Sequence, residues 1–532
     1  MATPQRIRQQ MPVGGLRSSW PADALEPTQS PRAINVRFRF GEVRSGPGRD
    51  VLSGPNTAED VLWIGRYPMV DGTEWALKLS ETGFFRWGSA VPGTPREWHT
   101  ITGPGMTGTN RWSTCIGENR FFFAKKSNAI HQWSGAVADP FGALGGAAPT
   151  NARFVAYFAN HLVAGDTVEG GSEYTNRIRW AKNGDYTTWT GDGTGFLDLG
   201  GVGDEGAVQA PLMGLHPLGQ RLAAYTAFGI LDVIATGTLT PVFRTEQRIW
   251  GLGCKAPYTI ASTGQEHLFL GTDRNVYIWD GTKLTPIGDP ILEELRGLVS
   301  SDSMETCFAT VATERQEYWL ILRDGNVFVF DYKRGVWARD TFPDITALGE
   351  VVDTRAASLW STWTNTWEQE TRTWDELGGA SRSVLWGGRS DGATFTVDEQ
   401  VAWDYFAVGS IMERYVETPD FYLPDPNGSP DPRLNVTLQR MLLSYEYVDP
   451  IRPATYGGSE ANPPPFLAEV SMDRGQTWQS QAITPQRGGY SLLDWNLTGH
   501  VIRFRFRESD VTGQFRWRSY QWEFVDAGPW NG

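Results

Sequence analysis

The sequence predicts an all-β protein: a six- or seven-bladed β-propeller followed by a β-sandwich, with an extended N-terminal arm. Three observations lead to this prediction. The chain has 532 residues, more than one hydrophobic core usually organises. It contains 24 Trp and 60 Gly, a composition typical of short strands joined by tight turns. A strand–turn–strand pattern also recurs between residues 55 and 400.

The predicted arm covers residues 1–50, which lack the recurring pattern. These residues carry eight Arg against four acidic residues, whereas the whole chain has a net charge of −14. A basic segment on an acidic body predicts docking to an acidic surface, such as that of a neighbouring subunit; a solvated tail explains the charge equally well. The candidate docking residues are Arg6, Arg8, Arg17, Arg32, Arg37 and Arg39.

The predicted propeller covers residues 51–408. In each unit, a short apolar strand is followed by a Gly, Asp or Asn turn and by a second strand that contains aromatic residues. The clearest copy consists of Glu317–Leu322, the turn Asp324-Gly325, and Asn326–Asp331. Successive units lie roughly 45 to 60 residues apart, which matches one four-stranded blade. A helical interruption is predicted at Pro290–Val299 from the spacing of its Leu and Ile residues.

The predicted sandwich covers residues 409–532. It begins with a Pro- and Asp-rich linker around Pro419–Pro432 and continues with long alternating strands. In the run Val501–Arg507, Ile and Phe alternate with Arg, so one face of the strand is apolar and the other is charged. This pattern predicts a half-buried antiparallel strand.

One segment of the sandwich matches an Asp-box turn. In such a turn the Asp side chain accepts backbone N–H groups, the Gly takes a positive φ, and the Trp packs beneath. Asp boxes also recur in sialidases, so a propeller glycosidase is an alternative to a structural protein. The residues of the predicted turn are Ser471, Asp473, Gly475 and Trp478.

A second segment is rich in Trp and Thr. We interpret its aromatic residues as packing at a blade edge or a subunit interface, where Trp is enriched. The alternative is a carbohydrate-binding platform. The candidate interface residues are Trp360, Trp363, Trp367 and Trp374.

Other functional classes lack a sequence signal. The six His residues are scattered, with no His-Glu-x-x-His motif and no i, i+4 pair, so we predict no metal site. No phosphate-binding Gly-rich loop and no nucleophile elbow occur, so we predict no cofactor and no catalytic residues. The chain has no run of about 18 apolar residues, so we predict no membrane span.

Three separated stretches together resemble one protein family. In this order they are similar to the tail hub, or nozzle, proteins of tailed bacteriophages, which are also called packaged-DNA stabilisation proteins. The sequence departs from the usual Arg-Pro-Gly at Arg44–Gly48, which reads Arg-Ser-Gly-Pro-Gly. The matching segments are Met11–Leu16, Ala24–Pro27, Ala33–Val36 and Gly41–Arg44; Arg177–Trp189; and Glu469–Trp478, Gly488–Tyr490 and Asp494-Trp495.

The resemblance implies a structural virion protein without catalytic residues; a carbohydrate-binding adsorption protein at the tail tip is the alternative. Such a protein forms a homo-oligomeric ring, usually a hexamer, that lines or closes the DNA exit channel. Its implied partners are the tail adaptor or head–tail connector, and a tail fibre, spike or needle protein. Phage DNA would pass without sequence-specific binding, which suits an acidic chain. The protein would be assembled in the host cytoplasm and would reside in the virion.

Overall fold

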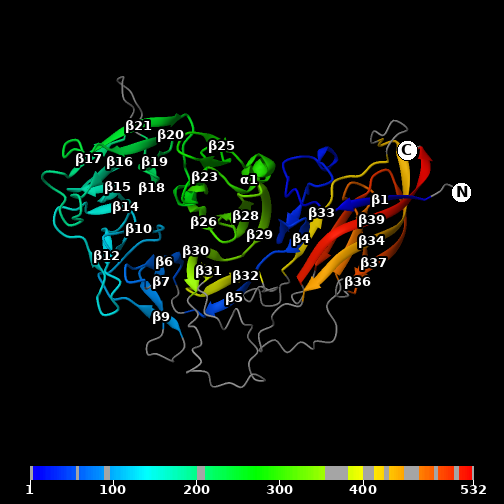
Figure 1. Cartoon of the computed structure of the whole chain (residues 1–532), viewed down its shortest axis with the longest axis horizontal. Helices are drawn as coiled ribbons and strands as arrows, with labels where there is room; N and C mark the ends of the chain where they lie inside the picture. Colours follow the sequence, from blue (N-terminus) through cyan, green and yellow to red (C-terminus); the bar gives the residue numbers. More distant parts are fainter. Residues whose placement is uncertain are drawn as a thin grey trace, which may run out of the picture.

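The computed structural model describes residues 4–55, 59–72, 74–88, 96–199, 210–353, 382–399, 412–423, 431–448, 466–484, 489–508 and 514–529. Within these ranges the protein is all-β, with antiparallel strands in many small sheets (Figure 1). This confirms the predicted all-β class. The α-helix α1 (Leu292–Leu298) and the 3-10 turn η3 (Asp289–Ile291) lie where a helical interruption is predicted. The other 3-10 turns are η1 (Ala22–Ala24), η2 (Pro257–Thr259) and η4 (Met304–Thr306).

Seven of the sheets contain four strands each, and we number them 1 to 7 along the chain. Sheets 1 to 3 are β6 (Val61–Pro68), β7 (Glu74–Ser80), β8 (Phe84–Gly88) and β9 (Glu97–Thr100); β10 (Ser113–Gly117), β11 (Arg120–Ala124), β12 (His131–Trp133) and β13 (Gly142–Ala143); and β14 (Asn151–Phe158), β15 (His161–Glu169), β16 (Ser172–Trp180) and β17 (Gly195–Asp198). Sheets 4 and 5 are β18 (Leu212–Leu218), β19 (Arg221–Thr226), β20 (Gly229–Ala235) and β21 (Phe243–Trp250); and β22 (Ala261–Ser262), β23 (His267–Leu270), β24 (Val276–Trp279) and β25 (Leu284–Pro286). Sheets 6 and 7 are β26 (Phe308–Ala312), β27 (Glu317–Ile321), β28 (Asn326–Asp331) and β29 (Val336–Thr341); and β30 (Ile345–Asp353), β31 (Arg382–Arg389), β32 (Thr394–Asp398) and β5 (Gly48–Ser53).

Local sequence explains the hairpins within these sheets. In sheet 6, the Asp324 carboxylate accepts the N–H of Asn326 at 3.0 Å, and Gly325 adopts a φ of +81°. A Cβ atom at Gly325 would lie 2.7 Å from the carbonyl oxygen of Phe342, so only Gly fits this turn. The flanking strands then pair Ile321 with Val327 and continue in register. The predicted Asp-Gly turn and both its strands therefore occur in the structure.

Each sheet packs against the next through buried apolar side chains. For example, Phe122 of sheet 2 and Val155 of sheet 3 belong to one hydrophobic cluster. The last sheet also packs against the first, because Trp386 of sheet 7 shares a cluster with Val61 of sheet 1. The contacts between neighbouring sheets therefore close on themselves.

The seventh sheet takes its outer strand from the beginning of the chain. Strand β5 pairs with β32 in the register Val51 to Phe395, although the two strands are more than 300 residues apart. The buried Arg49 side chain of β5 donates to the carbonyl of Pro343 at 2.8 Å and lies over the ring of Phe342. This pairing joins the two ends of the seven-sheet region.

Two further sheets lie beside the seven, toward the yellow-to-red end of the chain (Figure 1). One has the strand order β2 (Ala33–Ile34), β33 (Arg414–Glu417), β38 (Arg503–Glu508), β35 (Phe466–Ser471) and β36 (Gln479–Ile483). The other has the order β3 (Val36–Arg39), β4 (Glu42–Ser45), β39 (Gln514–Pro529), β34 (Leu434–Val448) and β37 (Tyr490–Gly499), with β1 (Gln5–Gln10) also paired to β39.

Aromatic side chains pack between these two C-terminal sheets. The rings of Phe466 and Tyr445 are 4.9 Å apart, and those of Phe504 and Tyr520 are 5.3 Å apart. Phe504 and Phe506 are fully buried, whereas the alternating Arg503 and Arg505 form ion pairs with Asp420 and Glu469. The two-faced strand predicted at Val501–Arg507 is therefore present.

The N-terminal residues do not form a separate extended arm, so that prediction is wrong. Strands β1, β3 and β4 belong to the six-stranded sheet, β2 belongs to the five-stranded sheet, and β5 completes sheet 7. Figure 1 shows the blue N-terminal strands among the yellow and red strands. The reason is that Met11, Val36, Phe38 and Val43 are buried in the main hydrophobic core, which a free arm could not provide.

Candidate functional site

The first strands of the seven four-stranded sheets surround one cavity of about 620 Å³. This volume lies within the range of small-molecule sites. The cavity reaches the surface, because Ile116 and Ser262 in its wall are exposed. Lining residues from the seven sheets, in order, are Trp63, Cys115, Val155, His216, Ser262, Thr310 and Glu350.

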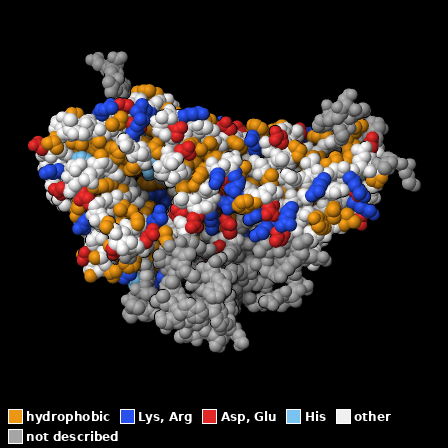
Figure 2. Space-filling view, viewed as in Figure 1, with side chains coloured by type: hydrophobic (Ala, Val, Ile, Leu, Met, Phe, Trp, Pro, Cys, Tyr) orange, Lys and Arg blue, Asp and Glu red, His pale blue; other side chains and the backbone are white. Residues whose placement is uncertain are grey.

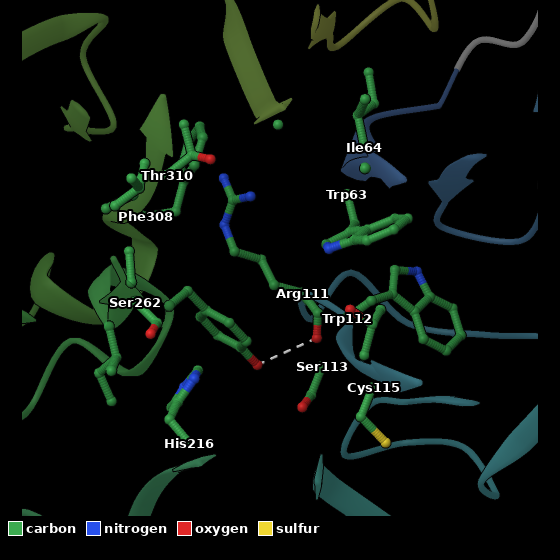
Figure 3. Close-up of a pocket in the computed structure, with 18 of the residues that line it drawn as sticks. Trp63, Ile64, Arg111, Trp112, Ser113, Cys115, His216, Ser262, Phe308 and Thr310 are labelled. Atoms are coloured by element: carbon green, nitrogen blue, oxygen red, sulfur yellow. Dashed lines mark hydrogen bonds between the residues drawn. The ribbon is translucent and has the colours of Figure 1, made fainter. Parts of the chain in front are cut away.

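Arg111 extends into this cavity from the segment before β10 (Figure 3). Its backbone carbonyl accepts the Tyr258 hydroxyl at 3.2 Å, which fixes the start of the side chain. Its guanidinium carbon lies 3.7 Å from the centre of the Phe308 ring, and its Nη1 donates to the carbonyl of Leu62 at 3.3 Å. The next residue, Trp112, is buried and donates to the carbonyl of Ser80 at 2.8 Å.

Arg111 is a cation without an ion pair. Within the described part of the chain, no carboxylate oxygen lies within 4 Å of its guanidinium, and Asp60 acts on it only through a longer-range attraction. Burial lowers the pKa of Arg111 to about 10, so the group remains charged at pH 7. The one carboxylate among the described lining residues is that of Glu350, which accepts the backbone N–H and the hydroxyl of Thr313.

His216 and Cys115, which also line the cavity, are neutral at pH 7. Burial, together with the nearby His267, lowers the pKa of His216 to about 3. Burial raises the pKa of the Cys115 thiol, so this group remains protonated at pH 7. The cavity therefore offers hydrogen-bond donors and a cation, whereas a glycosidase needs a pair of carboxylates across the scissile bond.

The Asp-box residues form a hydrogen-bonded turn at the end of β35. The Asp473 carboxylate accepts the Thr477 N–H and the Ser471 hydroxyl, at 2.8 and 2.7 Å. Gly475 has a φ of +83°, and its N–H donates to the Ser471 oxygen at 2.7 Å. The half-buried Trp478 ring lies 4.2 Å below the guanidinium of Arg505. The Asp473 carboxylate is therefore occupied by hydrogen bonds within the turn itself.

Two of the candidate docking residues are used inside the molecule. Arg37 is buried and donates to Glu317 at 3.0 Å and to Asp340 at 2.8 Å. Arg39 donates to the same Glu317 at 2.8 Å. Burial alone would lower the pKa of Arg37, but Asp340 and Glu317 raise it above its ordinary value. The prediction that Arg37 and Arg39 dock onto a partner is therefore wrong, because both form ion pairs between β3 and sheet 6.

The remaining candidate Arg residues lie nearer the surface. Arg6 pairs with Glu523 and keeps two thirds of its side chain exposed, and Arg8 is exposed on the same strand. Arg17 lies 4.9 Å from the Trp20 ring, and Arg32 is exposed. On the face shown in Figure 2, acidic and basic side chains are interspersed along the molecule. Docking through these four residues stays a prediction.

The candidate interface residues Trp360, Trp363, Trp367 and Trp374 lie outside the described residues. Sequence reasoning did not single out Arg111. Its sequence neighbourhood, Asn110-Arg111-Trp112, matches no binding motif, and only the folded chain shows that its guanidinium lies in a cavity without an ion pair among the described residues.

No group of three or more His, Cys, Asp or Glu residues in the described ranges is arranged to hold a metal ion. Likewise, no described helix is long and apolar enough to span a membrane.

No protein-family model matches this chain, and no curated protein sequence matches it. The fold and the contacts above therefore carry the functional argument, together with the resemblance of the three sequence segments.

Proposed function

We propose that the seven four-stranded sheets form a seven-bladed β-propeller and that the two C-terminal sheets form a β-sandwich. Three findings support this proposal. The sheets follow one another along the chain, each shares a hydrophobic cluster with the next, and the first strand of each borders one cavity. The N-terminal β5 also pairs with β32 in the last sheet. The two ends of the seven-sheet region therefore meet in one sheet, which would hold such a ring closed.

We propose that the protein is a structural component of a bacteriophage tail, the hub or nozzle between the adaptor and the distal tail parts. The observation that carries this proposal is the role of the N-terminal segment. Residues 33–36 and 41–44, which resemble the phage family, form β2, β3 and β4 at the junction of the two parts. Asn35, with a φ of +55°, donates its backbone N–H to the carbonyl of Arg339 and its amide to that of Glu413.

This junction supports a load-bearing rather than a catalytic role. Buried ion pairs from Arg37 connect β3 to sheet 6, and apolar residues of both parts belong to one continuous core. A molecule built this way resists relative movement of its two parts, because separating them would expose paired charges and apolar surface together. Such rigidity suits a component that withstands the pressure of packaged DNA.

The size of the cavity bears on where DNA would pass. At about 620 Å³ it has the dimensions of a small-molecule site, so we place the DNA channel between copies of the chain in a ring. The net charge of −14 favours weak contact with the DNA phosphates during passage.

Quantitative mass spectrometry of purified phage particles tests the proposed function. The protein should copurify with particles in a fixed copy number, and six copies per particle are expected. Particles made from a genome with a stop codon in this gene should lack the distal tail and lose their DNA. Abundant protein in the infected cell, together with infectious particles that lack it, would contradict the proposal.

Charge reversal at exposed Arg residues tests the docking part of the proposal. The double variant R8E/R32E should enter particles less efficiently, because both side chains are exposed on the N-terminal segment. The matched control is R120E in sheet 2, outside that segment. Equal incorporation of both variants into particles would contradict a docking role for Arg8 and Arg32.

A further inference from the structure

Several donor groups point into the same part of the cavity. In Figure 3 the guanidinium of Arg111 points toward the hydroxyl of Thr310, and the indole nitrogen of Trp63 lies on the ring edge nearer to Arg111. Trp63 belongs to sheet 1 and Thr310 to sheet 6, whereas Arg111 belongs to the segment that precedes sheet 2. The closed ring of sheets is therefore what brings them together.

The guanidinium of Arg111 has unused donor capacity. It carries five N–H groups, and the structure gives it one hydrogen bond, the 3.3 Å contact to the Leu62 carbonyl. The Phe308 ring covers one face of the guanidinium plane, which leaves the edges of the plane for hydrogen bonds. Asp60 attracts this guanidinium from beyond ion-pair distance, so a bound anion would be its first direct ionic contact.

The surrounding groups include two carboxylates, those of Glu350 and Asp60, but neither forms an ion pair with Arg111 in the described residues. His216 is neutral at pH 7, and the Glu350 carboxylate accepts two hydrogen bonds from Thr313. Arg66, at the wall of the same cavity, is half-exposed and lies 3.7 Å from Glu74. Of the two Arg residues that line the cavity, Arg111 is therefore the one without an ion pair within the described residues.

We propose that this cavity binds a small organic anion, whose carboxylate or phosphate group is held by the Arg111 guanidinium. The planar fork of the guanidinium matches two oxygens of either group, and the Thr310 hydroxyl and Trp63 N–H are additional donors. The rings of Phe308 and Trp63 provide an apolar wall for the rest of the molecule. This binding site is independent of the proposed role in the virion.

Thermal unfolding of the full chain with three probes tests the proposal. Benzoate and phenyl phosphate supply a ring with a carboxylate or a phosphate, and benzyl alcohol supplies the ring without charge. At constant ionic strength, at least one anion should raise the unfolding temperature saturably, because a ligand that binds the folded state stabilises it. Benzyl alcohol should have no such effect. The comparison of the two anions identifies the preferred group.

Two variants assign the effect to Arg111. R111Q should weaken binding of the effective anion about tenfold or more, as expected for the loss of a charged hydrogen-bonding partner. R66Q removes the same charge from the same cavity wall and should change the affinity less than about threefold, because Arg66 is half-exposed. T310V, which removes only a hydroxyl, should weaken binding by a smaller factor than R111Q and provides the test if R111Q does not fold.

The proposal is overturned if neither anion stabilises the wild-type protein. It is also overturned if benzyl alcohol stabilises the protein as much as the anions do, or if R111Q, or T310V in its place, binds as tightly as wild type.

Discussion

The guanidinium groups of Arg37 and Arg111 both lie among strands, but their surroundings differ. Arg37 is buried at the junction of the two parts and meets two carboxylates, those of Glu317 and Asp340. Arg111 lies in the cavity of the seven sheets and meets a carbonyl and an aromatic ring. Full internal pairing indicates a structural role, whereas a guanidinium that faces a cavity without forming an ion pair indicates a place for a ligand.

The largest expected effect comes from deleting residues 1–40, which removes β1, β2 and β3. The deletion leaves Glu317 and Asp340 buried without Arg37 and exposes the side of β39 that pairs with β1. We expect loss of cooperative unfolding, measured by circular dichroism during heating. A truncated protein that unfolds as sharply as the full chain, within a few degrees of it, would show that the N-terminal strands are not integral to the fold.

The next effect is that of Arg37→Met. Removing one partner of a buried ion pair leaves the other charge uncompensated, so we expect a loss of about 3–5 kcal/mol in the free energy of unfolding. The control is Arg6→Met, because Arg6 is largely exposed and its pair with Glu523 should contribute about 0–1 kcal/mol. Chemical denaturation measures both. Equal losses for the two variants would refute the difference between buried and exposed pairs.

A smaller effect concerns the pH dependence of stability at His131, which packs against Phe123 and Phe141. Burial, with a contribution from Lys125, lowers the pKa of His131 to about 4. Below pH 6.5 the unfolded chain binds a proton at this residue that the folded chain does not bind. The free energy of unfolding should therefore fall as the pH decreases from about 6.5 to 4.

The variant His131→Phe isolates this contribution. It should reduce the loss between pH 7 and pH 4.5 by on the order of 2 kcal/mol, measured by urea denaturation at both pH values. Parallel losses in the variant and in the wild-type protein would mean that His131 is protonated in the folded state as readily as in the unfolded chain.

The smallest effect compares two Asp residues of the C-terminal sheets. Asp473→Ala removes the acceptor of the Thr477 N–H and should cost about 1 kcal/mol. Asp494→Ala removes an exposed ion pair with Arg440 and should change stability by less than about 0.5 kcal/mol. Thermal unfolding of the two variants measures this difference, and a larger loss at Asp494 would contradict it.

Much of the local structure could be predicted from the sequence, because it depends on neighbouring residues. The hairpin around Asp324-Gly325 and the helix α1 lie where turn chemistry and apolar spacing place them. The aromatic content of the second strands varies, from none in β15 to three in β11. The recurring pattern therefore predicts the number of units only as six or seven.

The long-range pairings could not be predicted in the same way. The register of β5 on β32 and the contact of Arg37 with Asp340 join residues more than 300 positions apart. A count of charges suggested a free basic arm, but the alternating Val36 and Phe38 of that segment are buried in the core. Arg111 was missed because its distinguishing property, a guanidinium that faces a cavity and forms no ion pair in the described residues, exists only after folding.

The measurement that tests the proposed function most directly is the mass of the purified full-length protein by light scattering, combined with electron micrographs of the same sample. Because the charges of β3 are paired within one chain, assembly must use other surfaces and should not require unfolding of the junction. A ring of six 59.2 kDa chains with a central opening is the predicted result. A stable monomer that forms no ring, even in the presence of purified phage heads, would contradict the account.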